Sequence, residues 1–232
     1  MRNLYMCLLL AVLSACQKST FIDPQPAQPF TPVKEVAQSP LVVILGSSTA
    51  SGAGASDYKH AWAGLFSSYL NKGKIINLAR GGYTTYHILP DGQEGLVAKR
   101  PSADTLRNIT AALKLHPTLM IISMTTNDVA NGYSVDEVMY NLQTIRRIAL
   151  DNGVKRILIT TSMPRKLNAQ ATARWLQQRD RTMRAYEQDA VNFFDPLADA
   201  DNLFQANLTP DGIHPNDDGH RLLFKQLVSR LE

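Results

Sequence analysis

The sequence predicts an α/β fold in which a parallel β-sheet is covered by helices on both faces. Five short apolar runs are separated by segments that carry apolar residues at helical spacing. Strands that alternate with helices form parallel sheets, and the helices then cover both faces of the sheet. No internal repeat is evident, so we expect one folded domain. The five runs span residues 41–45, 74–78, 119–124, 156–160 and 191–194.

Two helices are expected in the first half of this domain. The segment after the first run repeats apolar residues at helical spacing from Trp62 to Leu70. After the second run, a stretch with glycine and threonine precedes Leu106, Ile109 and Leu113, which share one helical face. We therefore place a helix in each of these segments.

Three helices are expected in the second half. Ser134 and Glu137 form a capping box, which opens a helix that ends at Gly153. A long polar helix is expected over residues 169–187. A final helix carries leucines at helical spacing over residues 223–231.

The composition is that of an ordinary globular protein, with 44% hydrophobic and 19% charged residues. The formal net charge is +4, and no run of basic residues is longer than two. Nucleic-acid binding uses a clustered basic surface, so we expect no nucleic-acid partner. The two cysteines form no Cys-x-x-Cys pair and the five histidines are scattered, so we expect no structural metal.

The N-terminus has the pattern of a secretory signal. Residues 1–3 carry a positive charge, and the apolar stretch that follows over residues 4–12 is too short to span a bilayer. Residues 13–16, Leu-Ser-Ala-Cys, resemble the lipobox of bacterial lipoproteins, in which the cysteine is lipidated and becomes the first residue. The alternative is a plain signal peptide that is cleaved after Ala15 and leaves Cys16 as a free thiol.

The chain is therefore expected to have three parts. Residues 1–15 form the signal peptide, and residues 16–40 form the lipidated Cys16 and an extended tether with five of the twelve prolines. The folded domain spans residues 41–232. Gln17 after the cysteine resembles lipoproteins that are sent to the outer membrane. The resemblance thus implies a lipid anchor in the bacterial cell envelope.

Four polar segments follow predicted strands, and we expect them at one edge of the sheet, because loops that leave the carboxyl ends of parallel strands line the ligand crevice. The first segment is not a phosphate-binding loop, since no lysine follows Gly52 or Gly54. A dinucleotide fingerprint fails too, because Asp57 stands where it needs glycine. Taken singly, each segment could be an ordinary turn. The segments span residues 46–54, 80–84, 125–128 and 211–215.

Together, the four segments carry the groups that nucleophilic acyl transfer needs: a serine on a tight turn, a histidine, a carboxylate and donors for an oxyanion. This set resembles the SGNH hydrolases, also called GDSL esterases and lipases, over most of the predicted domain. The α/β-hydrolase motif Gly-x-Ser-x-Gly is absent, because its second glycine is missing. The residues that match the family, in order, are Ser48, Gly82, Asn127, Asp211 and His214, the last two in its Asp-x-x-His spacing.

The resemblance implies a three-layer α/β/α, flavodoxin-like fold with a five-stranded parallel sheet, and ester hydrolysis through an acyl-serine. Ser48 would be the nucleophile, His214 the general base and later the acid, and Asp211 the group that orients His214. The backbone N–H groups of Ser48 and Gly82 and the side-chain amide of Asn127 would form the oxyanion hole. This chemistry requires no cofactor and no metal.

Two positions depart from the family pattern. Ser47 stands where Gly-Asp-Ser has aspartate, and Thr125 stands where Gly-x-Asn-Asp has glycine. Ser47 lacks a charge but can still bond backbone groups in the turn. Thr125 adds a β-branched side chain near the pocket floor. Neither change removes an atom from the reaction, and both side chains suit a small acyl group.

The expected substrate is a short-chain ester, such as an acetyl group on a saccharide. A tethered enzyme outside the cytoplasm meets glycans, and no apolar insertion is present to sheath a long acyl chain. We expect a monomer, held at the membrane by its lipid. The rival hypothesis is a non-catalytic surface lipoprotein that binds a glycan or a protein partner on the same fold. Five further residues are expected near the crevice, where each could contact the substrate or be an ordinary surface or core residue. They are Arg80, Tyr83, Tyr86, His87 and Arg165.

Overall fold

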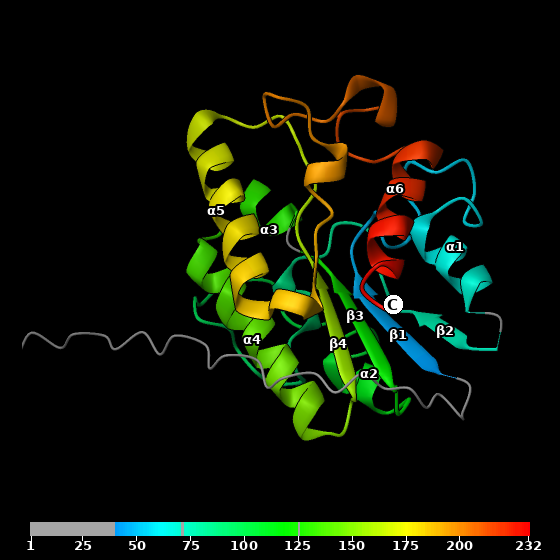
Figure 1. Cartoon of the computed structure of the whole chain (residues 1–232). Coiled ribbons are helices and arrows are strands. Elements are labelled where there is room, and N and C mark those ends of the chain that lie inside the picture. Colours follow the sequence, from blue (N-terminus) through cyan, green and yellow to red (C-terminus); the bar gives the residue numbers. More distant parts are fainter. Residues whose placement is uncertain (1–39, 71, 125) are drawn as a thin grey trace, which may run out of the picture.

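The computed structural model describes residues 40–70, 72–124 and 126–232, and it confirms the three-layer α/β/α fold (Figure 1). Its centre is a five-stranded sheet in the order β2-β1-β3-β4-β5, and every neighbouring pair of strands is parallel. The strands are β1 (Leu41–Gly46), β2 (Lys74–Asn77), β3 (Leu119–Ser123), β4 (Arg156–Thr160) and β5 (Ala190–Val191).

The three central strands are apolar along their length because helices cover both of their faces. In β1, Val43 and Leu45 pack on one face and Val42 and Ile44 on the other. β3 and β4 alternate in the same way. This two-sided burial explains why these strands are continuous apolar runs in the sequence.

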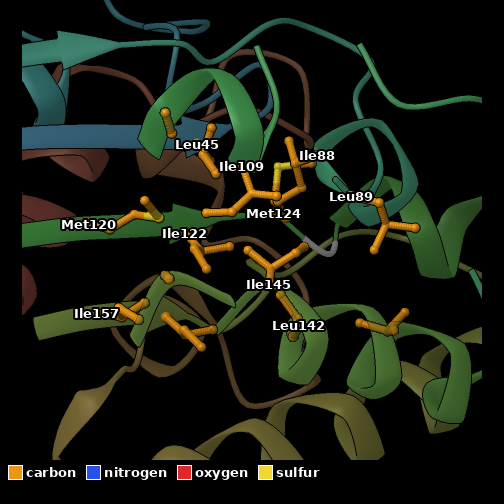
Figure 2. Packing of buried hydrophobic residues seen from close by; sticks show 14 of the residues in the cluster. Leu45, Ile88, Leu89, Ile109, Met120, Ile122, Met124, Leu142, Ile145 and Ile157 are labelled. Atoms are coloured by element: carbon orange, nitrogen blue, oxygen red, sulfur yellow. The ribbon is translucent and has the colours of Figure 1, made fainter. Parts of the chain in front are cut away.

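The helices divide between the two faces of the sheet (Figure 1). α1 and α6 contact each other and cover one face, and α4 and α5 pack together on the other. Figure 2 shows the second interface, where Leu142 and Ile145 of α4 meet Ile122 of β3. The helices are α1 (Trp62–Tyr69), α2 (Ile109–Leu113), α3 (Thr126–Ala130), α4 (Val135–Asp151), α5 (Ala169–Tyr186) and α6 (Asp217–Val228).

Local signals in the sequence explain where several helices begin. Ser134 and Glu137 form the predicted capping box at the start of α4. Asn108, Asn168 and Asn216 cap α2, α5 and α6, because each side-chain oxygen accepts a backbone N–H of the first turn.

The structure corrects three sequence predictions and adds one helix. The final helix, α6, ends at Val228, so Leu231 lies beyond it. Leu106 does not share the buried face of α2, because α2 begins only at Ile109 and Leu106 is 78% exposed. The fifth strand ends at Val191, because the Asn192 side-chain oxygen accepts the backbone N–H of the two residues after Phe193 and turns the chain. Part of the third polar segment forms the short helix α3 rather than a loop.

The predicted signal peptide, the lipidation site at Cys16 and the tether lie outside the described residues. Thr125, one of the two departures from the family pattern, lies outside them too. Among the helices that the structure describes, none is long and apolar enough to cross a membrane.

Candidate active site

Three side chains from opposite ends of the domain meet at the carboxyl edge of the sheet. The His214 Nε2 atom lies 3.0 Å from the Ser48 Oγ atom, although the two residues are 166 positions apart. On its other side, the His214 Nδ1 atom lies 2.8 Å from the Asp211 Oδ2 atom. The structure thus brings together the three residues that the sequence predicts as nucleophile, base and orienting carboxylate.

Asp211 is fixed by its own loop as well as by the imidazole. Its Oδ1 atom accepts the backbone N–H groups of Ile213 at 2.9 Å and of His214 at 2.7 Å. Burial works to raise the pKa of Asp211, but the hydrogen bonds from His214 and Ile213 outweigh it and lower the pKa to about 2. Asp211 is therefore an anion at neutral pH, and its charge favours a proton on the His214 Nδ1 atom.

The turn that presents Ser48 is tight because glycine precedes it. A Cβ atom on Gly46 would lie 2.4 Å from the Ala50 Cβ atom, so only glycine fits at the end of β1. After this point the Ser47 carbonyl accepts the Ser51 N–H at 3.0 Å, and the Ser48 carbonyl accepts the Ala53 N–H at 2.9 Å. These bonds turn the chain sharply and leave the Ser48 side chain facing His214.

The loop of Ser48 and the loop of His214 touch each other through their backbones. Gly54 has φ +93°, and a Cβ atom on it would lie 2.2 Å from the Pro215 carbonyl oxygen and 2.8 Å from the His214 Cβ atom. This close approach is possible only without a side chain at residue 54. Gly54 therefore helps set the distance between Ser48 and His214, a role that the sequence analysis missed.

His220 of α6 joins this helix to the segment that follows Ser48. Its Nδ1 atom accepts the Trp62 N–H at 3.2 Å, and its Nε2 atom donates to the Ala53 carbonyl at 3.1 Å. Burial lowers the pKa of His220 to about 4. The neutral imidazole has one donor and one acceptor, which this arrangement uses in full. His220 belongs to none of the motifs identified in the sequence.

Two of the predicted oxyanion donors converge above the Ser48 turn. The Ser48 N–H donates to the Ser47 Oγ atom at 2.6 Å. The Asn127 Nδ2 atom donates to the same Oγ atom at 3.3 Å and to the Tyr83 carbonyl at 2.9 Å. The loop that holds Gly82 packs against Ser48. A Cβ atom on the neighbouring Gly81 would lie 3.8 Å from the Ser48 Cβ atom.

A buried polar cluster holds this second loop in place. Asp128 is fully buried, and its carboxylate accepts the Thr85 N–H at 3.0 Å and the Thr85 hydroxyl at 2.5 Å. The Thr85 hydroxyl in turn accepts from the Asn141 amide at 3.0 Å. Burial raises the pKa of Asp128 to about 6 despite the opposing hydrogen bonds from Thr85. Asp128 therefore supports the loop and is not the carboxylate beside His214.

The model of the GDSL-like lipase/acylhydrolase family matches residues 44–222 of the chain. The chain belongs to this family. The match covers all five of the residues predicted to act in the reaction. Ester hydrolysis is therefore the general activity expected of the protein.

Several solved structures have the same fold. A GDSL-like lipase from Bacteroides thetaiotaomicron is 19% identical, with a TM-score of 0.64 over 85% of this chain and 90% of that chain. A psychrotrophic esterase from Pseudoalteromonas is 18% identical, with a TM-score of 0.59 over 83% of this chain and 97% of that chain. A Geobacillus acetyl-xylooligosaccharide esterase is 16% identical, with a TM-score of 0.60 over 83% and 94%. No curated protein matches the chain by sequence.

Most of the other candidate contacts in this GDSL-family chain have structural partners. The Tyr83 hydroxyl donates to Asp104, and the Tyr83 ring stacks on His87 with 4.6 Å between ring centroids. Tyr86 is buried and donates to Glu137. Arg80 is exposed and lies 3.9 Å from the Asp104 carboxylate, and the partly exposed Arg165 lines a shallow hollow beside α5.

The described residues contain no group of three or more histidine, cysteine, aspartate or glutamate side chains placed to hold a metal ion. The arrangement of Ser48, His214 and Asp211 is instead that of a hydroxyl, a base and a charged carboxylate in one hydrogen-bonded line. Such a line can move the hydroxyl proton to the imidazole as the oxygen attacks an electrophile.

Proposed function

We propose that this chain is a serine ester hydrolase that transfers an acyl group first to Ser48 and then to water. The observation that carries the proposal is the unbroken line of hydrogen bonds from Ser48 through His214 to Asp211. A glycan-binding surface protein would have no use for a base positioned 3.0 Å from a serine hydroxyl. Membership of the GDSL-like family supports the same activity.

In the first half of the reaction, the His214 Nε2 atom takes the Ser48 hydroxyl proton while the Ser48 Oγ atom forms a bond to the ester carbonyl carbon. The carbonyl oxygen becomes an anion, for which the Ser48 N–H, the Gly82 N–H and the Asn127 amide are the donors. Each such donor is worth about 100-fold to 1000-fold in rate. The intermediate then expels the alcohol, which takes the proton from His214 and leaves an acyl-serine.

In the second half, His214 removes a proton from water, and the water oxygen attacks the acyl-serine. Ser48 leaves with the proton held on the His214 Nε2 atom, which restores the starting state and releases the acid. Asp211 keeps the imidazole in the tautomer that has its proton on Nδ1 and stabilises the imidazolium that forms twice in each cycle. Its pKa of about 2 keeps it charged throughout.

The proposed substrate is a short-chain ester, and acetyl groups on saccharides are the favoured example. The Geobacillus structure with this fold is named an acetyl-xylooligosaccharide esterase, which supports this choice by analogy. The small polar side chain of Ser47 beside the nucleophile also favours a small acyl group. We further propose that lipidation at Cys16 anchors the enzyme in the bacterial cell envelope, most simply at the outer membrane.

Turnover of p-nitrophenyl acetate by the wild-type protein, with Ser48→Ala as control, tests the reaction. A fluorophosphonate probe followed by peptide mapping should find the label on Ser48. Glycan binding by a wild-type protein that neither turns over an ester nor takes the label would favour the non-catalytic alternative. Labelling of Ser47 instead would overturn the assignment of the nucleophile.

The acyl preference and the anchor need separate experiments. Esters from acetate to palmitate, compared with acetylated xylan fragments, give the chain-length profile. A kcat/KM that climbs with chain length, as expected from burying methylenes at about 0.8 kcal/mol each, would indicate a lipase instead. Fractionation of cells that express wild type or Cys16→Ala tests the anchor, which equal recovery in the soluble fraction would refute.

A further inference from the structure

Ser47 lies between two of the groups that the proposed reaction uses. Its Oγ atom accepts the Ser48 N–H at 2.6 Å and the Asn127 Nδ2–H at 3.3 Å. Ser47 is only 7% exposed, so bulk water has little access to its hydroxyl oxygen. An oxygen atom of this chain therefore already stands where the two donors converge, which is the position that a developing oxyanion would need.

The Asn127 amide does not depend on Ser47 for its orientation. Its Nδ2 atom makes its shorter hydrogen bond, of 2.9 Å, to the Tyr83 carbonyl. An amide nitrogen carries two hydrogens, and this bond fixes one of them. The other hydrogen points to Ser47, and it is the one that remains for a substrate oxygen.

We propose that the Ser47 hydroxyl occupies the oxyanion hole of the resting enzyme and must rotate out before acyl transfer. This inference rests on the proposed esterase function and concerns the same site. The Ser47 backbone cannot move easily, because its N–H donates to the Ser123 carbonyl at 3.1 Å and its carbonyl accepts from Ser51 at 3.0 Å. Rotation about the Cα–Cβ bond between staggered positions clears the hole and leaves this backbone unchanged.

Ser47 is on this account a positioning residue that competes with the substrate. Each turnover breaks the two hydrogen bonds to Ser47 before the donors can bind the oxyanion. An ordinary hydrogen bond is worth a few-fold in an equilibrium constant, so the competition should lower kcat/KM by about fivefold. Removal of the hydroxyl should therefore make the enzyme faster, which is opposite to the loss expected if the hydroxyl supported the hole.

Wild type and two variants differ in the strength of the hydrogen-bond acceptor at residue 47. Wild type has a hydroxyl, Ser47→Cys has a thiol that accepts only weakly, and Ser47→Ala has no acceptor. Ser162→Ala is the matched control, because the Ser162 hydroxyl is also buried but bonds Gln178 at 3.1 Å instead of the site. Thermal unfolding shows whether each variant folds.

Two measurements on these proteins test the proposal. The first is kcat/KM for p-nitrophenyl acetate. The second is the inhibition constant of phenylboronic acid, whose boron atom bonds the Ser48 oxygen while His214 takes the proton, so that a tetrahedral anion places an oxygen in the hole. For Ser47→Ala, we expect kcat/KM to rise by about fivefold and the inhibition constant to fall by a similar factor. Ser47→Cys should lie between, and Ser162→Ala should match wild type.

A folded Ser47→Ala protein that has lower kcat/KM and binds the boronic acid more weakly would overturn the proposal, and so would one that is unchanged in both. If Ser47→Ala does not fold, Ser47→Cys decides by the same two signs. Failure of the esterase function itself looks different, because wild type would then neither hydrolyse the ester nor react at Ser48 with a fluorophosphonate.

Discussion

Gly54 is where the loop of Ser48 touches the loop of His214, so its replacement by alanine should separate the two side chains. The added Cβ atom would lie 2.2 Å from the Pro215 carbonyl oxygen, whereas real Cβ atoms stay beyond about 3.0 Å, so one loop must move by about 0.8 Å. The Ser48 Oγ and His214 Nε2 atoms are now 3.0 Å apart. A misplacement of about 1 Å costs about 100-fold in rate, so we expect kcat/KM of Gly54→Ala to fall by about 100-fold.

The same change also strains the backbone, and a control must separate the two effects. Gly54 has φ +93°, where a residue with a side chain costs roughly 1–2 kcal/mol of stability. Gly153 has φ +83° with nothing within 4 Å of an added Cβ atom, and it precedes β4 at the opposite edge of the sheet. Gly153→Ala should therefore lose similar stability and keep full activity. Esterase kinetics and thermal unfolding of both variants make the comparison, and a Gly54→Ala enzyme as active as Gly153→Ala would refute the reasoning.

Three further predictions concern charge and packing. Asp211→Asn should lower kcat by about 10,000-fold through the wrong imidazole tautomer in a protein that still folds, and near-normal kcat would show that another group orients His214. The pKa of His220 is lowered from 6.5 to about 4, which destabilises the fold as pH falls from 6.5 to 4, whereas the pKa of Asp128 is raised from 3.8 to about 6, which stabilises it over a similar range. These two effects on the free energy of unfolding nearly cancel in wild type. Without the His220 imidazole, the free energy of unfolding of His220→Gln should rise by about 3 kcal/mol relative to that of wild type between pH 7 and pH 4. Urea unfolding measures this difference, and parallel pH curves for the two proteins would contradict it. Leu142→Ala should cost about 3 kcal/mol because Leu142 is fully buried, whereas Leu106→Ala should cost almost nothing in the same assay.

The fold could be predicted because the central strands are covered on both sides. β1, β3 and β4 are continuous apolar runs in the sequence, and their bounds agree with the predicted runs to within one residue. The spacing of apolar residues gave a wrong prediction where an apolar residue is exposed. Leu106 has helical spacing to Ile109, but the Asn108 side chain caps α2 and leaves Leu106 outside the helix.

The candidate site could be predicted as a set of residue types but not as a set of contacts. Ser48, Asp211 and His214 belong to short motifs, and a motif keeps its spacing in the sequence. The contacts of Gly54 with Pro215 and of His220 with Ala53 join residues that are more than 150 positions apart, so no local sequence pattern predicts them. The two hydrogen bonds that converge on Ser47 depend on side-chain directions, which the family pattern could not supply for a serine in place of aspartate.

The proposed nucleophile lies in the turn just after the first strand of the sheet, and its base lies just before α6, 166 residues later. A chain still being synthesised therefore has the serine long before it has the histidine, and a chain clipped ahead of residue 211 has a hydroxyl without a proton acceptor. Ester cleavage would begin only when α6 has packed against α1, since His220 of that helix also holds the carbonyl of Ala53. Under the proposed mechanism, activity therefore requires the last 22 residues, from Asp211 to Glu232, to be present and folded against the loop of Ser48.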